Sequence, residues 1–162
     1  MNWFAKIAVL ILITSLVLNS CKKQVCDDPV PFIEFKEFIQ KTDKSAKLVL
    51  NFRDCNGDIG LTQADTVEPY KFNLYMEYYE LQNGTWVNLV PLIPYYYRIP
   101  VLLKDGREDN TEGEIEVTIP TYYRPNTPSY SFDTIKFEVK ILDQALNESN
   151  IVETNLIIKP SN

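Results

Sequence analysis

Residues 133–141 read Asp-Thr-Ile-Lys-Phe-Glu-Val-Lys-Ile, so that every second side chain is apolar and those between are polar. The same alternation recurs in 46–53, 70–81 and 113–119. A period of two indicates β-strands with one face on a core and the other in water. Four more segments are rich in aromatic and β-branched residues and are further strand candidates: 32–39, 85–90, 95–103 and 150–158.

Turn signals separate these segments. Asn83-Gly84 between two apolar runs predicts a hairpin, because a type I′ turn needs positive φ at both central residues. Asp105-Gly106 predicts a second turn, and 103–113 and 121–131 are the longest expected loops. The pattern predicts an all-β chain, an immunoglobulin-like antiparallel β-sandwich of about seven to eight strands. A closed barrel is the alternative.

Composition restricts the function classes. The chain has 162 residues with 45% hydrophobic and 23% charged side chains, which is typical of one globular domain. A formal charge of −6 argues against nucleic acid as a partner. There is no histidine, which excludes Ser-His and Cys-His nucleophiles and imidazole metal ligands.

The N-terminal region predicts a membrane anchor. Lys6 precedes the apolar run 7–18, which is too short to span a bilayer but suits a signal peptide. The following Leu18-Asn19-Ser20-Cys21 resembles a bacterial lipobox, in which the cysteine is acylated and becomes the new N-terminus. An ordinary secretory signal with a chance cysteine is the alternative. We therefore expect a signal peptide at 1–20, lipidation at Cys21, a tether at 21–31 and the β-domain at 32–162.

Lys22 follows the predicted acylated cysteine, where an aspartate would resemble an inner-membrane retention signal. We therefore expect the protein on the outer membrane, held there by its lipid anchor. The sequence leaves open whether the domain faces the periplasm or the cell exterior.

The loop after the second strand candidate carries hard oxygen ligands. Asp54, Asn56 and Asp58 alternate, the Gly60 carbonyl stands seventh counted from Asp54, and Asp65 stands twelfth. Calcium takes six to eight oxygens, and an EF-hand supplies them from similar positions. The EF-hand glycine at position six is replaced here, and the flanks are strands. The pattern predicts Ca²⁺ on a β scaffold, with an empty Asx/Gly-rich turn as the alternative.

Two stretches carry a family resemblance. Residues 56–61, Asn-Gly-Asp-Ile-Gly-Leu, look like the acidic signature of uncharacterised Bacteroidota lipoproteins with an immunoglobulin-like β-sandwich. Residues 133–154 are similar to the closing hairpin of bacterial immunoglobulin-like domains, although this chain has Leu146 where those have glycine. The resemblance implies the fold and the compartment, and it implies no activity.

Cysteines and tyrosines complete the candidate sites. With Cys21 lipidated, a Cys26–Cys55 disulfide would close about 30 residues and stabilise the fold by roughly 3–4 kcal/mol; free thiols are the alternative. Tyrosines occur in runs at 78–79, 95–97 and 122–123. Some of their rings should be exposed, because consecutive strand residues face opposite sides.

These observations predict a lipid-anchored, non-catalytic envelope protein with a structural or interaction role and a protein or glycan partner. The alternative is a glycan-binding accessory lipoprotein that uses exposed tyrosines such as Tyr96 and Tyr123. A hydrolase with paired carboxylates ranks third, because no acid pair stands in a recognisable motif.

Overall fold

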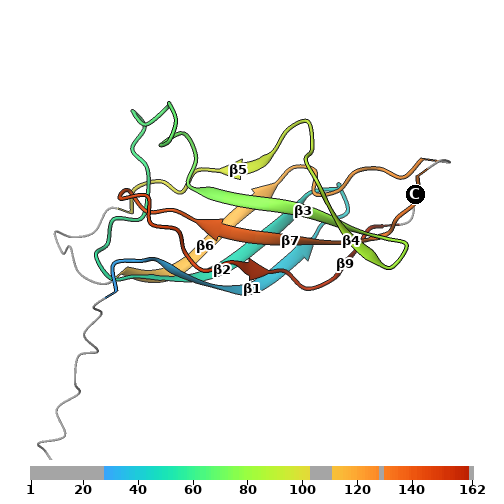
Figure 1. Ribbon diagram of the computed structural model, residues 1–162, viewed down its shortest axis with the longest axis horizontal. Helices are drawn as coiled ribbons and strands as arrows, with labels where there is room; N and C mark the ends of the chain where they lie inside the picture. The colour runs from blue at the N-terminus through green and yellow to red at the C-terminus, as the bar shows by residue number, and fades with distance from the viewer. Residues whose placement is uncertain (1–27, 103–110, 128–129, 161–162) are drawn as a thin grey trace, which may run out of the picture.

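The computed structural model describes residues 28–102, 111–127 and 130–160. This part of the chain is all β and forms two antiparallel sheets that face each other (Figure 1). The smaller sheet has the order β1-β2-β6, with β1 at Phe32–Gln40, β2 at Ala46–Asp54 and β6 at Thr111–Ile119. The larger sheet contains β3 (Leu74–Gln82), β4 (Thr85–Leu89), β5 (Tyr95–Tyr97), β7 (Thr134–Ile141), β8 (Val152–Glu153) and β9 (Ile157–Ile158).

The topology is that of a β-sandwich, and the two separate sheets exclude the closed barrel. In the larger sheet β3 lies beside β7, β4 and β5 both pair with the free edge of β3, and β8 and β9 both pair with the free edge of β7. This order matches the A-B-E and C′-C-F-G sheets of immunoglobulin-like sandwiches.

The core forms where the apolar faces of both sheets meet. The four apolar side chains of β7 predicted to face inward are each 0% exposed. Phe137 packs against Phe38 of the smaller sheet at 5.8 Å between ring centroids and against Tyr78 of β3 at 5.5 Å. The alternation read from the sequence therefore identifies the buried face correctly.

The candidate 70–81 is a strand only from Leu74 onward, and two further strand candidates are much shorter than predicted. The segment 95–103 is a strand only over Tyr95–Tyr97, and 150–158 contributes two short strands, β8 and β9. Between β8 and β9, Thr154 makes both hydrogen bonds with Phe137 of β7, one of them through its side chain. The Thr154 N–H donates to the Phe137 carbonyl at 2.9 Å, and the Thr154 hydroxyl accepts the Phe137 N–H at 3.0 Å. Ser149 makes the same pair of bonds with Ile141. Side-chain oxygens thus satisfy backbone donors at this edge.

The predicted hairpin turn is confirmed, since Asn83 and Gly84 have φ of 51° and 81° between β3 and β4. The Asp105-Gly106 turn lies outside the described residues. So do the signal peptide at 1–20, Cys21, Cys26 and all of the tether before residue 28. In the described part of the chain, no helix is long and apolar enough to cross a membrane.

Leu146 occupies the turn after β7 with a φ of 66°, a conformation that costs an L-residue roughly 1–2 kcal/mol. Leu146→Gly should raise the free energy of unfolding by about 0.5–1 kcal/mol, because the strain relieved exceeds the chain entropy that glycine adds to the unfolded state. Chemical denaturation measures this change. Asn83→Gly is the matched control and should be close to neutral, because asparagine tolerates positive φ. A lower stability of Leu146→Gly would contradict the prediction.

Candidate functional site

The acidic loop leaves the end of β2 and is fixed at both ends. Asp54 is fully buried, and its Oδ2 accepts the N–H of Ile59 at 3.0 Å. Farther along, Leu61 donates to the Ile99 carbonyl at 2.8 Å. Gly60 has a φ of 117°, and a Cβ there would lie 2.5 Å from the Pro100 carbonyl oxygen. Glycine is therefore required for the loop to lie this close to the chain that follows β5.

The fold brings a third aspartate to this loop. Asp143 follows β7 and is 1% exposed, and the neighbouring Gln144 donates its N–H to the Asp58 carbonyl at 3.2 Å. Both oxygens of Asp143 accept bonds from Asn147, from its backbone N–H and from its side-chain amide, each at 2.8 Å. Asp54, Asp58 and Asp143 form what we call the aspartate cluster.

The charges of the aspartate cluster act on one another. Burial, followed by the negative charges of Asp143 and Asp54, raises the pKa of Asp58 to about 6. Burial also raises the pKa of Asp54, and the charge of Asp143 adds to this shift against the opposing bond from Ile59. One oxygen of each, Oδ1 of Asp54 and Oδ1 of Asp58, is buried without a hydrogen-bond partner. Burial of a carboxylate oxygen without a hydrogen-bond donor destabilises the folded state.

Asn56 and Asp65, which were also predicted as calcium ligands, make other contacts. Asn56 is exposed, with its side chain hydrogen-bonded to Asp58. The Oδ2 of Asp65 accepts the N–H and the hydroxyl of Thr62 at 2.7 and 2.8 Å, and its carboxylate therefore closes its own turn. Within 28–102, 111–127 and 130–160, no group of three or more His, Cys, Asp or Glu side chains is placed so that it could hold a metal ion. Calcium binding stays a prediction.

Cys55 is disulfide-bonded. The other two cysteines of the chain, Cys21 and Cys26, both lie outside the described residues. The pairing of Cys55 with Cys26 in particular therefore stays a prediction.

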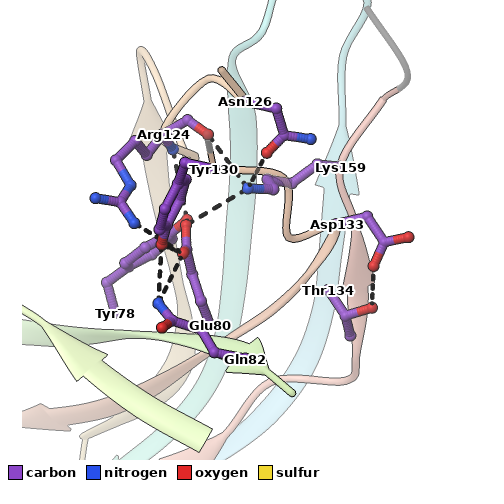
Figure 2. A network of polar contacts seen from close by, with 9 residues as sticks. All are labelled: Tyr78, Glu80, Gln82, Arg124, Asn126, Tyr130, Asp133, Thr134 and Lys159. Carbon is purple, nitrogen blue, oxygen red and sulfur yellow. Dashed lines mark hydrogen bonds and ion pairs between the residues drawn. The ribbon is translucent and has the colours of Figure 1, made fainter. Parts of the chain in front are cut away.

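A second cluster, which the sequence analysis missed, surrounds Glu80 of β3 (Figure 2). Glu80 is fully buried and accepts the hydroxyl of Tyr78 at 2.6 Å and that of Tyr130. Arg124 Nη2 lies 3.1 Å and Lys159 Nζ 3.4 Å from its carboxylate. Burial, together with the bond to Glu80, raises the pKa of the Tyr78 hydroxyl. We call this the Glu80 network; it joins β3 to the β6–β7 connection and to the chain after β9.

Beside this network lies a groove of about 650 Å³, which we call the tyrosine groove. Its outer wall is the segment 90–94, Val-Pro-Leu-Ile-Pro, which connects β4 to β5 on the same edge of β3. Val90, Leu92 and Ile93 are 83%, 100% and 80% exposed. The segment projects on the side of the larger sheet away from β1 and β2 (Figure 1). Tyr78 and Arg124 of the Glu80 network also line the groove.

The tyrosines are less exposed than the sequence suggested. Tyr122 and Tyr123 are 1% and 4% exposed, because they lie in a coil segment where strand alternation does not apply. In β5 the alternation holds: Tyr95 and Tyr97 pack on the core, and burial raises the pKa of each to about 12. Tyr96 faces the other side and contacts Tyr75 at 4.8 Å between ring centroids.

Comparison with known proteins adds no family. Neither a scan of family models nor searches of curated proteins and of solved structures find a match to this chain.

Lys159→Met tests the Glu80 network. The Lys159 side chain is 1% exposed, and its removal leaves a buried carboxylate with one cation fewer, which should lower the free energy of unfolding by about 3 kcal/mol. The control Lys140→Met breaks the exposed pair with Glu148 at 2.7 Å and should cost less than about 1 kcal/mol. Thermal or denaturant unfolding compares the two variants. If both variants lost the same free energy of unfolding, the buried ion pair of Lys159 with Glu80 would contribute no more to stability than an exposed pair.

Proposed function

We propose that this protein is a lipid-anchored, non-catalytic interaction module of the outer membrane that binds a protein partner through the tyrosine groove. The observation that carries the proposal is the segment 90–94, which presents three large aliphatic side chains to solvent beside that groove. Contiguous exposed apolar surface of this kind marks interaction sites.

The chemistry of the groove favours a protein over other ligands. Its lining is mostly aromatic and aliphatic, and Arg124 is the charged side chain among its lining residues. Burying a side chain such as Leu92 or Ile93 against a partner contributes roughly 1.5–3 kcal/mol each. Tyrosine and arginine are also enriched among the residues that dominate binding energy at interfaces. A partner with an apolar segment and an acidic side chain near Arg124 fits this surface.

The anchor and the absence of catalysis are supported by the sequence. The apolar run 7–18 and the lipobox-like Leu18-Asn19-Ser20-Cys21 support acylation at Cys21, and Lys22 supports the outer membrane. The resemblance to Bacteroidota lipoproteins agrees with this placement. The chain has no histidine. The buried carboxylate beside the groove, Glu80, is held by two cations and two phenols, an arrangement that suits a structural role.

Glycan binding is the second candidate, favoured by one observation: three consecutive tyrosines, 95–97, line the groove. Aromatic faces can stack on sugar rings. Tyr123 lines the groove but is nearly fully buried, so Tyr96 is the better candidate for stacking. The fully exposed Leu92 favours the protein partner.

Cys21→Ser tests the anchor. The variant should lose acylation and cleavage at this site, because the thiol that receives the lipid is gone, and it should therefore lack acyl chains and keep its signal peptide. Mass spectrometry of the N-terminus measures both effects, with Cys26→Ser as the matched control that keeps the anchor. Unchanged acylation and processing would overturn the lipoprotein proposal.

A photo-crosslinking amino acid in place of Leu92 tests the groove in living cells. It should give a discrete protein adduct that disappears when Ile93→Asp is added, because a charge in the apolar contact opposes burial. The same amino acid in place of Leu156, which is 64% exposed, is the control and should give no such adduct. The glycan-binding function would be favoured instead if no protein adduct formed and if the protein bound to a glycan array but lost this binding in Tyr96→Ala.

A further inference from the structure

The smaller sheet ends in a long and regular edge strand. β6 spans Thr111–Ile119 and pairs with β2 in one unbroken antiparallel register. It stands last in the order β1-β2-β6, and within the described residues no strand pairs with its outer edge. Such edges are normally protected, because their free N–H and C=O groups can pair with another chain.

The other edges of the sandwich are protected. Those of the larger sheet have short strands, and prolines separate β4 from β5. At the β1 edge a bulge interrupts the register between Phe35 and Glu37. The Asn150 side chain takes the place of a neighbouring strand there, since it accepts the Ile33 N–H and donates to the Ile33 carbonyl, each at 2.8 Å. β6 has neither a proline nor a bulge, so among the described strands its edge is the one open to strand addition.

The register fixes which groups of β6 face outward. Residues of a strand inside an antiparallel sheet bond alternately to the strand on one side and to the strand on the other. Just before β2, the Ser45 carbonyl accepts the Lys41 N–H on the β1 side, so odd residues of β2 bond to β1 and even ones to β6. Leu50 therefore bonds with Ile115, which it faces. The residues of β6 that hold their N–H and C=O groups away from β2 are Glu112, Glu114, Glu116 and Thr118.

A cavity of about 270 Å³ lies along this edge, lined by β6 on one side and by the chain after β5 on the other. Its walls include the buried side chains of Leu74, Ile115 and Val117 and the partly exposed Leu102. Among the lining residues it shares only Tyr97 with the tyrosine groove. Successive side chains of a strand point to opposite faces, so every second side chain of an added strand would enter this apolar cavity.

The outer face of β6 determines the charge of the strand that fits. Glu112, Glu114 and Glu116 give β6 three carboxylates and no cation. Two of these carboxylates already bond toward the sheet, Glu114 to Lys36 at 2.6 Å and Glu116 to Lys47 at 2.8 Å. Opposite charges on neighbouring strands stabilise the pairing, and like charges destabilise it. Pairing of two β6 edges would set glutamates against glutamates, so the edge disfavours a second copy and favours a basic strand.

We propose that β6 is a docking site for an extended segment of a protein partner in which apolar residues alternate with lysine or arginine. The segment adds a fourth strand to the smaller sheet. Its backbone bonds to the outward N–H and C=O groups of β6, its apolar side chains enter the cavity, and its basic side chains lie beside the three glutamates. This surface is separate from the tyrosine groove, so the inference goes beyond the proposed function and does not depend on it.

The probe for this site is the synthetic peptide acetyl-Lys-Val-Lys-Val-Lys-Val-Lys-amide, added to the full chain in non-ionic detergent. The control peptide has the same composition in the order Lys-Lys-Val-Val-Val-Lys-Lys. Titration calorimetry should give at least about tenfold tighter binding for the alternating peptide, because only alternation places valines in the cavity and lysines beside the glutamates. Equal binding of the two peptides would overturn the proposal.

Two substitutions at one position separate backbone pairing from charge. Glu116→Gln removes a carboxylate but keeps the N–H, and should weaken binding of the alternating peptide roughly two- to fivefold. Glu116→Pro removes the same charge and also the outward N–H, which makes no bond to β2, and should weaken binding at least about tenfold more. Denaturant unfolding of both variants checks that they are folded. Equal weakening in the two folded variants would mean that the peptide is held by charge alone, contrary to the proposal.

Hydrogen exchange of the unmodified chain gives a readout that needs no variant. The alternating peptide should slow exchange of the outward backbone amides of Glu114 and Glu116 at least about tenfold, with no change in the segment 90–94. Protection of 90–94 instead would place the peptide in the tyrosine groove and refute docking at β6. Protection of the β6 amides without peptide, growing with protein concentration, would assign this edge to a second copy and equally refute it.

Discussion

The packing of Phe137 at the centre of the sandwich is the contact on which the other elements depend. Phe137 is fully buried and lies within 6 Å, between ring centroids, of Phe38 from the smaller sheet and of Tyr78 and Tyr95 from the larger one. These rings fix the spacing of the two layers. Because Tyr78 also donates to Glu80 and Tyr95 lies at the end of the segment 90–94, the same packing places the Glu80 network and the tyrosine groove.

The sequence predicts the fold well because its strongest signal is local. The segments 46–53 and 133–141 match β2 and β7 to within one residue, since a period of two is visible without knowledge of tertiary contacts. The two strands that were predicted much too long, 95–103 and 150–158, were misjudged for one reason. Aromatic and aliphatic residues in 95–103 and 150–158 suit a strand as well as an exposed connection, and the hydroxyls of Ser149 and Thr154 that replace the ladder leave no local pattern.

The candidate sites were predictable only in part. Asp54 and Asp58 stand out in the sequence because the spacing of their oxygens is local, and both belong to the aspartate cluster. Asp143 could not be connected to them, because only the alignment of the β2 and β7 ends brings it near. The same holds for the Glu80 network, whose residues come from three separate parts of the chain: β3, the β6–β7 connection and the chain after β9.

The edges of the larger sheet limit how a partner can bind to that sheet. On one edge β4 and β5 are short and interrupted by Pro91 and Pro94, and on the other β8 and β9 have two residues each. Short strands and prolines prevent an added strand from pairing along the sheet. Backbone recognition is therefore disfavoured at both edges of the larger sheet, where a partner would have to bind through side chains. The segment 90–94, which separates β4 from β5, also exposes Leu92 and Ile93. The same segment therefore blocks strand addition at this edge and creates the apolar surface.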